Sequence, residues 1–173
     1  MKKIFLLTFF VFAILTTQAQ QFPKLGENIA NPSLGKFEGK WIWTAGADTI
    51  RLILKKENTK NPGGVNITAD IITGYYTYKK GNVIIDDNYE LSKKKYDDKT
   101  SLMMLGIRQQ TDSISGFIYD AKKDKTLPLT LTISPDRKSL HFRLRKSGEQ
   151  IKINKKVHEG YTLPFNLKFR KEN

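Results

Sequence analysis

Apolar and polar residues alternate with a period of two along most of this chain, and the 3.6-residue period of an amphipathic helix does not appear. In residues 126–134, every second position is a branched aliphatic: Leu127, Leu129, Leu131 and Ile133. Residues 139–145 and 163–169 repeat the pattern. Because neighbouring side chains on a strand point to opposite faces, such alternation is typical of half-buried β-strands.

Turn residues divide the alternating pattern into short segments. The predicted strands cover residues 40–45, 49–57, 67–78, 83–86, 101–109, 113–120, 126–134, 139–145, 149–153 and 163–169. Two hairpins are expected, 101–109 with 113–120 and 126–134 with 139–145, and Pro128 predicts an edge or a bulge in its strand. The sequence therefore predicts an all-β domain, an antiparallel meander of about 8–10 strands that closes as a barrel, with a β-sandwich as the alternative.

The first residues have the layout of an export signal. Lys2 and Lys3 precede an uncharged apolar run over residues 4–15, and small residues at Thr17 and Ala19 suit a cleavage site. A bilayer span takes about 20 apolar residues, so a membrane anchor is disfavoured. We therefore expect a signal peptide over 1–19, an irregular leader over 20–36 with one helical turn near 33–37, and a single β-domain over 37–173.

The composition bears on the cellular compartment, the source of stability and the partners that we expect for this chain. The chain has no cysteine, so an exported form carries neither disulfides nor a lipid on an N-terminal cysteine, and its core alone must stabilise it. The expected location is periplasmic or secreted. With 30 basic and 17 acidic residues, the net charge is +13, which favours polyanionic partners.

Two resemblances add to this interpretation. Gly39-Lys40-Trp41, before the first strand, resembles the start of lipocalin-like (calycin) barrels. The resemblance implies that Gly39 and Trp41 plug the barrel floor, that Arg143 or Arg170 packs over the tryptophan, and that an apolar ligand occupies the interior. The whole chain, through residues 37–49 and 52–58, resembles an uncharacterised family of small exported proteins from Gram-negative bacteria.

The sequence contains no recognisable catalytic or metal-binding signature. Two histidines, His141 and His158, and no cysteine make a zinc site improbable. Asp86-Asp87 and Asp97-Asp98 are acid pairs, but neighbours on a strand point to opposite faces, and turn positions explain both pairs. We predict no enzyme activity, no cofactor and no nucleic-acid partner.

Basic residues form the one surface pattern with a definite shape. His141, Arg143 and Arg145 alternate outward on one predicted strand, and Lys168 and Arg170 do so on another. If these strands are neighbours, Arg143, Arg145, Lys168 and Arg170 form an anion-binding face, since guanidinium groups bind phosphate and sulfate bidentately.

Three functions remain open at this point. The first is a non-enzymatic binding module for a small apolar ligand inside the barrel. This function requires a cavity, and an interior filled by four aromatic residues would rule it out: Phe117, Phe142, Phe165 and Phe169. The second is a cationic surface that binds an anionic envelope glycan or lipid. The third, from a different class, is a hydrolase of an envelope polymer.

Overall fold

The computed structural model describes residues 24–60, 66–94, 102–105, 112–146 and 159–172. The described strands are β1 (Asn28–Ile29), β2 (Gly39–Ala45), β3 (Asp48–Lys60), β4 (Thr68–Lys80), β5 (Val83–Asp87), β6 (Leu102–Leu105), β7 (Ser113–Asp120), β8 (Lys125–Ile133), β9 (Ser139–Leu144) and β10 (Asn166–Lys171). Two 3-10 turns, η1 (Pro32–Phe37) and η2 (Tyr89–Lys93), are the described helical elements, and neither is long and apolar enough to cross a bilayer. The predicted signal peptide and the strand expected at 149–153 lie outside the described residues.

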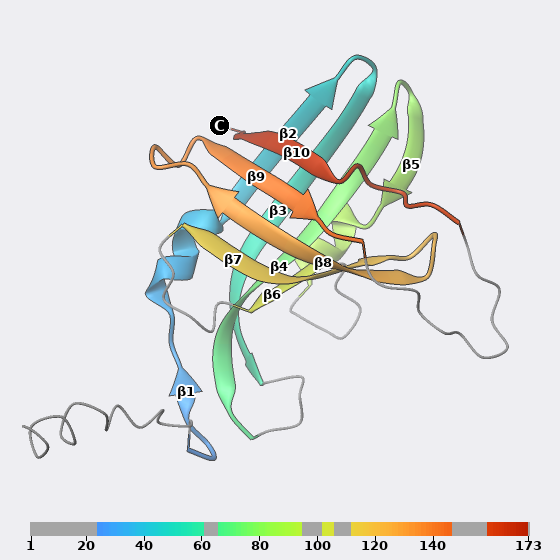
Figure 1. Cartoon of the computed structure of the whole chain (residues 1–173). Coiled ribbons are helices and arrows are strands. Elements are labelled where there is room, and N and C mark those ends of the chain that lie inside the picture. The colour runs from blue at the N-terminus through green and yellow to red at the C-terminus, as the bar shows by residue number, and fades with distance from the viewer. Residues whose placement is uncertain (1–23, 61–65, 95–101, 106–111, 147–158, 173) are drawn as a thin grey trace, which may run out of the picture.

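The strands form one strongly curled sheet with the order β1-β4-β3-β2-β10-β9-β8-β7-β6. All pairings are antiparallel except β1 with β4, so the sheet is mixed. β6 pairs not only with β7 but also with residues 71–74 of β4, which joins the far end of the path back to the sheet. The result is a barrel-like curl, a half-barrel, and the prediction of an all-β meander is confirmed (Figure 1).

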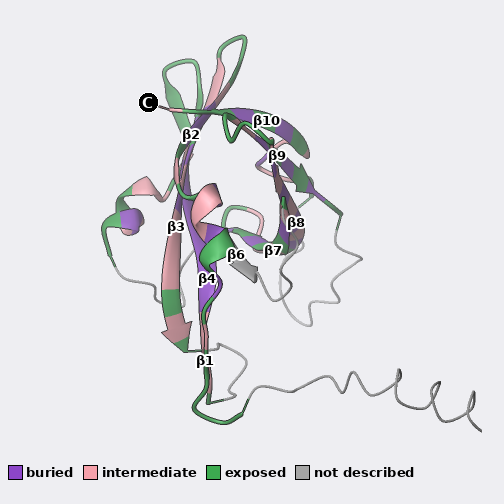
Figure 2. Cartoon of the chain, turned by 90° about the vertical axis from the view of Figure 1, so that its left-hand side faces the viewer, coloured by how far each residue is buried: buried purple, intermediate pink, exposed green. Residues whose placement is uncertain are grey.

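Alternation along the strands sets which residues face inward. In β8, Leu127, Leu129, Leu131 and Ile133 are buried, and the residues between them are partly exposed. β9 and β10 show the same pattern of burial. These inward side chains belong to one hydrophobic cluster that also receives Leu34 and Phe37 from η1. In the view along the curl, η1 lies across one end of it (Figure 2).

Several details of the sequence-based prediction change. The leader is not wholly irregular, because β1 adds a short parallel strand to β4, while the helical turn expected near 33–37 is η1. The last strand begins at Asn166 rather than at 163. The strand starts late because Pro164 has no amide hydrogen to donate to a ladder. The first contact with β9 is made by the Phe165 carbonyl, which accepts a hydrogen bond from the Leu144 amide.

Pro128 lies within the sheet and not on an edge strand, since β8 is paired on both sides. Its carbonyl accepts a hydrogen bond from the amide of Arg145, just after β9 ends. The amide and carbonyl of one strand residue point to the same side, so the missing donor of Pro128 faces the place where the β9 ladder has ended. Proline there gives up only the return bond, from the amide of residue 128 to the Arg145 carbonyl, which would be the last bond at this end of the β8–β9 ladder.

Candidate functional site

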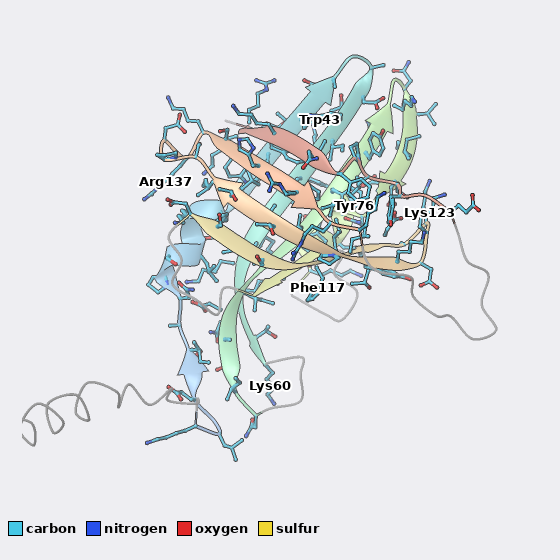
Figure 3. All side chains as sticks on the ribbon, viewed as in Figure 1. Trp43, Lys60, Tyr76, Phe117, Lys123 and Arg137 are labelled. Carbon is cyan, nitrogen blue, oxygen red and sulfur yellow. The ribbon has the colours of Figure 1, made fainter. Side chains whose placement is uncertain are left out.

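The candidate site is a groove on the outer surface of the sheet, over the strands that Figure 3 shows at the front of the molecule. It is open to solvent, encloses about 910 Å³ and is lined by Ser115, Thr130, Thr132, His141, Phe142, Arg143, Arg145, Asn166, Leu167 and Lys168. None of these lining residues is acidic. The groove is thus a polar, positively charged depression.

Strand register explains why the cations gather there. β9 is paired with β10, which places Lys168 directly opposite His141 and Asn166 directly opposite Arg143. On its other edge β9 is paired with β8, which places Thr132 opposite His141 and Thr130 opposite Arg143. Residues opposite each other on antiparallel strands project to the same face, with Cβ atoms about 5 Å apart. Two cross-strand rows therefore run over the groove, each combining hydroxyl groups with a cation.

Three of the four predicted anion-binding residues line the groove, and the fourth lies outside it. Arg143, Arg145 and Lys168 line the groove. Arg170 projects from the same face of β10 but lies opposite Ser139 and opposite Ile42 of β2, beyond the lining residues. The hypothesis of an anion-binding face required that the two strands with outward cations be neighbours, and the β9–β10 ladder meets this condition. The sequence did not indicate the contribution of β7 and β8, which supply the hydroxyl side chains, because the order of strands in the sheet decides which rows are adjacent.

The cations of the groove have no carboxylate partner among the described residues. The ion pairs in the described part of the chain join other side chains, such as Lys36 with Asp112 and Lys56 with Asp70. Arg143, Arg145 and Lys168 are all exposed to solvent. A group of cations on a concave surface, with no carboxylate partner in the described part of the chain, concentrates a positive potential that attracts anions.

A second open groove, of about 710 Å³, lies over the outer faces of β3 and β4. It combines cations such as Arg51 and Lys79 with the acids Asp87 and Glu172. The Arg51 guanidinium is 3.4 Å from the Glu172 carboxylate, so part of its charge is already neutralised. This second groove is accordingly a weaker candidate for an anion.

Trp41 and Gly39 lie at the start of β2, where the resemblance to lipocalin-like barrels places a floor plug. The Trp41 ring is fully buried, and its Nε1 donates to the Phe37 carbonyl at 3.0 Å. The cation over the ring is Lys171, whose Nζ is 5.2 Å from the ring centroid, and not Arg143 or Arg170. Lys171 follows Arg170 directly, and its partner in the β2 ladder is Trp41 itself.

Aromatic side chains occupy part of the interior of the curl. Phe142 and Phe169 are buried and their ring centroids are 5.8 Å apart. Phe165 packs against the Tyr161 ring at 4.8 Å. Phe117, in contrast, is 48% exposed on the outside of β7, because Ile114 and Ile118 occupy the inward positions of that strand. Phe117 is therefore not one of the aromatic residues that occupy the interior.

The acid pair Asp86-Asp87 divides between two faces, as the strand argument predicts. Asp86 accepts a 2.6 Å hydrogen bond from the buried Tyr76 hydroxyl, and Asp87 accepts one from Thr77 on the outer side. Burial, followed by the hydrogen bond to Asp86, raises the pKa of Tyr76 far above its ordinary value. That phenol stays protonated and acts as a donor. Asp97-Asp98 and His158 lie outside the described residues.

Comparison with known proteins gives one match. The profile of DUF6705, described as a family of unknown function, matches residues 1–172. No curated protein and no solved structure matches the chain significantly.

Proposed function

This chain belongs to the family of unknown function DUF6705, and from its cationic groove we propose that it is a binding protein for an anionic ligand, not an enzyme. The ligand chemistry is a phosphate or sulfate group, carried by an envelope glycan or by a lipid head group. The observation that carries the proposal is the joining of Arg143, Arg145 and Lys168 in one acid-free depression.

Two features support this assignment. A guanidinium group presents a planar fork of donors that matches two oxygens of a phosphate or sulfate, and Arg143 on β9 and Arg145 directly after β9 both line the groove. The hydroxyl groups of Ser115, Thr130 and Thr132 supply neutral donors beside them. An anion in the groove would therefore meet both charge and hydrogen-bond partners.

The proposed setting is outside the cytoplasm, as the signal-like residues 1–19 indicate. There the net charge and the groove would act together on polyanions of the cell envelope. A small apolar ligand inside the barrel and hydrolysis of an envelope polymer stay predictions.

Binding to a probe polymer tests the proposal. We expect the protein to bind dextran sulfate, but not uncharged dextran, and the affinity to fall as salt rises, since ions screen exposed charges. The variant R143Q/R145Q/K168Q should weaken binding at least tenfold. The matched control K24Q/K60Q/K80Q removes the same charge from exposed positions outside the groove and should bind nearly as well as the wild type.

Two further outcomes decide the source of the anion and the proposal itself. Stronger binding to vesicles of phosphatidylglycerol and phosphatidylcholine than to dextran sulfate would identify a lipid head group as the ligand. Equal losses in the groove variant and the control variant would show that net charge alone drives binding, and would overturn the groove assignment.

A further inference from the structure

The outer face of β7 carries an exposed aromatic pair that continues the cationic groove. Phe117 is 48% exposed and Tyr119 is 44% exposed, and they are two positions apart on the same face of the strand. Ser115, two positions earlier, already lines the groove. The aromatic pair and the groove therefore form one continuous surface.

Strand register connects Phe117 to the arginines. Phe117 lies opposite Pro128 of β8, and the Pro128 carbonyl accepts the amide hydrogen of Arg145. The adjacent row, one step along the strands, runs from Ser115 through Thr130 to Arg143. Since neighbouring strands lie about 4.8 Å apart, the Phe117 and Arg145 backbones are about 10 Å apart across the sheet. One small anion does not reach across that distance.

From this arrangement we propose that the ligand of the groove is an anionic oligosaccharide, one of whose sugar rings stacks on Phe117 while its charged groups contact Arg143 and Arg145. This inference rests on the proposed function and adds the class of ligand and a residue that recognises it. The apolar face of a sugar ring, made of C–H groups, gains dispersion contacts on a flat aromatic ring. The hydroxyl groups of Ser115 and Thr130, in the adjacent row with Arg143, match the hydroxyl groups of a sugar.

The surroundings favour a glycan over a lipid bilayer. About half of the Phe117 surface is covered, so the side chain lies partly against the sheet and does not stand free of it. The neighbouring Tyr119 hydroxyl donates to the Asp124 carboxylate at 2.8 Å, which puts negative charge beside the aromatic pair. An oligosaccharide in the groove can place its sulfate or phosphate groups on the arginines, away from this carboxylate, whereas a flat anionic surface resting on the aromatic pair would face it.

The test compares two polyanions that differ in the sugar ring. Dextran sulfate carries its charges on sugars, and inorganic polyphosphate carries charges without any ring. We expect Phe117→Ala to weaken binding to dextran sulfate about fivefold, the usual scale of an aromatic contact, and to leave binding to polyphosphate unchanged. Phe117→Tyr should restore the affinity for dextran sulfate, and Val83→Ala, at an exposed apolar position of β5, should have no effect.

The outcomes separate this inference from the proposed function. If R143Q/R145Q/K168Q loses binding but Phe117→Ala does not, the groove stands and the stacking is overturned. If Phe117→Ala weakens both polyanions equally, or weakens binding to phosphatidylglycerol vesicles more than to dextran sulfate, the sugar-specific contact is likewise overturned. Thermal unfolding of each variant shows whether the fold is intact. Phe117→Leu, which keeps apolar bulk without a ring, should weaken binding to dextran sulfate as much as Phe117→Ala does.

Discussion

A buried carboxylate, Asp120, fastens the irregular segment before β10 to the end of β7. Asp120 is only 2% exposed. Its two carboxylate oxygens accept hydrogen bonds of 2.7 Å from the amide and from the hydroxyl of Thr162, and one of them accepts a third, of 3.2 Å, from the amide of Lys123. These bonds hold the chain that leads into β10, a strand of the groove.

The magnitude of this contribution follows from the three bonds. A hydrogen bond to a charged group contributes about 1.5–3 kcal/mol net, and a donor left without a partner in a buried site costs about 1–3 kcal/mol. The Lys123 bond is the longest of the three, and the Thr162 hydroxyl can rotate toward water. We therefore expect Asp120→Ala to lower the free energy of unfolding by about 3–5 kcal/mol, a large part of the total stability of a typical domain.

Urea-induced unfolding, followed by tryptophan fluorescence, measures the effect. Thr162→Val is the matched comparison, since it keeps the amide donor and removes only the hydroxyl bond, and should cost about 1–2 kcal/mol. A loss below about 1 kcal/mol for Asp120→Ala would refute the reasoning, because it would mean that water replaces the bonds without penalty.

Two further predictions concern the start of β2 and the attachment of the leader. Gly39 has φ +125°, and an added Cβ would lie 3.1 Å from the Lys171 side chain, so Gly39→Ala should lower the free energy of unfolding by about 1–3 kcal/mol. In the control variant Gly35→Ala, the Cβ meets only an ordinary contact at 3.6 Å, so the loss should be smaller. Equal losses for the two variants in urea unfolding would contradict this. Burial alone would raise the pKa of Asp70, but hydrogen bonds from Lys56, Asn58 and the Asn31 amide, with the Lys56 charge, lower it overall. The stability that the ionised Asp70 contributes is therefore present above the ordinary carboxyl pKa of 3.8 and is lost as pH falls through the lowered value. The stability difference between the wild type and Asp70→Asn should shrink between pH 7 and pH 2, and a constant difference would count against the argument.

Local alternation was enough to predict most of the sheet. The inward residues of β8 and β9 follow from sequence because period two maps directly onto burial when one face is solvated. β4 obeys the rule less well, since Ile71 and Tyr75 are buried as well as Ile72 and Tyr76. There the outer face is also covered, and the contact of η2 with β3 and β4 supplies part of that cover. Such long-range contacts leave no trace in a local pattern.

The candidate site was predictable only in part, for a related reason. The outward cations of β9 and β10 can be recognised strand by strand, but the hydroxyl side chains of β7 and β8 join them only through the order of strands in the sheet. Phe117 shows the same limit, because an aromatic residue in an apolar strand suggests core until the inward positions of that strand are assigned to Ile114 and Ile118. Lys171, not an arginine, lies over Trp41, since the β2–β10 register decides which neighbour reaches the ring.

The most direct test of the central claim is to map the binding surface by nuclear magnetic resonance. Isotope-labelled protein lacking residues 1–19 would be titrated with short dextran sulfate oligomers while backbone amide shifts are recorded. The cationic groove predicts that the largest changes fall on residues 130–132, 141–145 and 166–168, with smaller changes near Phe117. Changes that are spread evenly over the basic surface, or that concentrate on the distal ends of β3 and β4 around Lys60, would contradict the account.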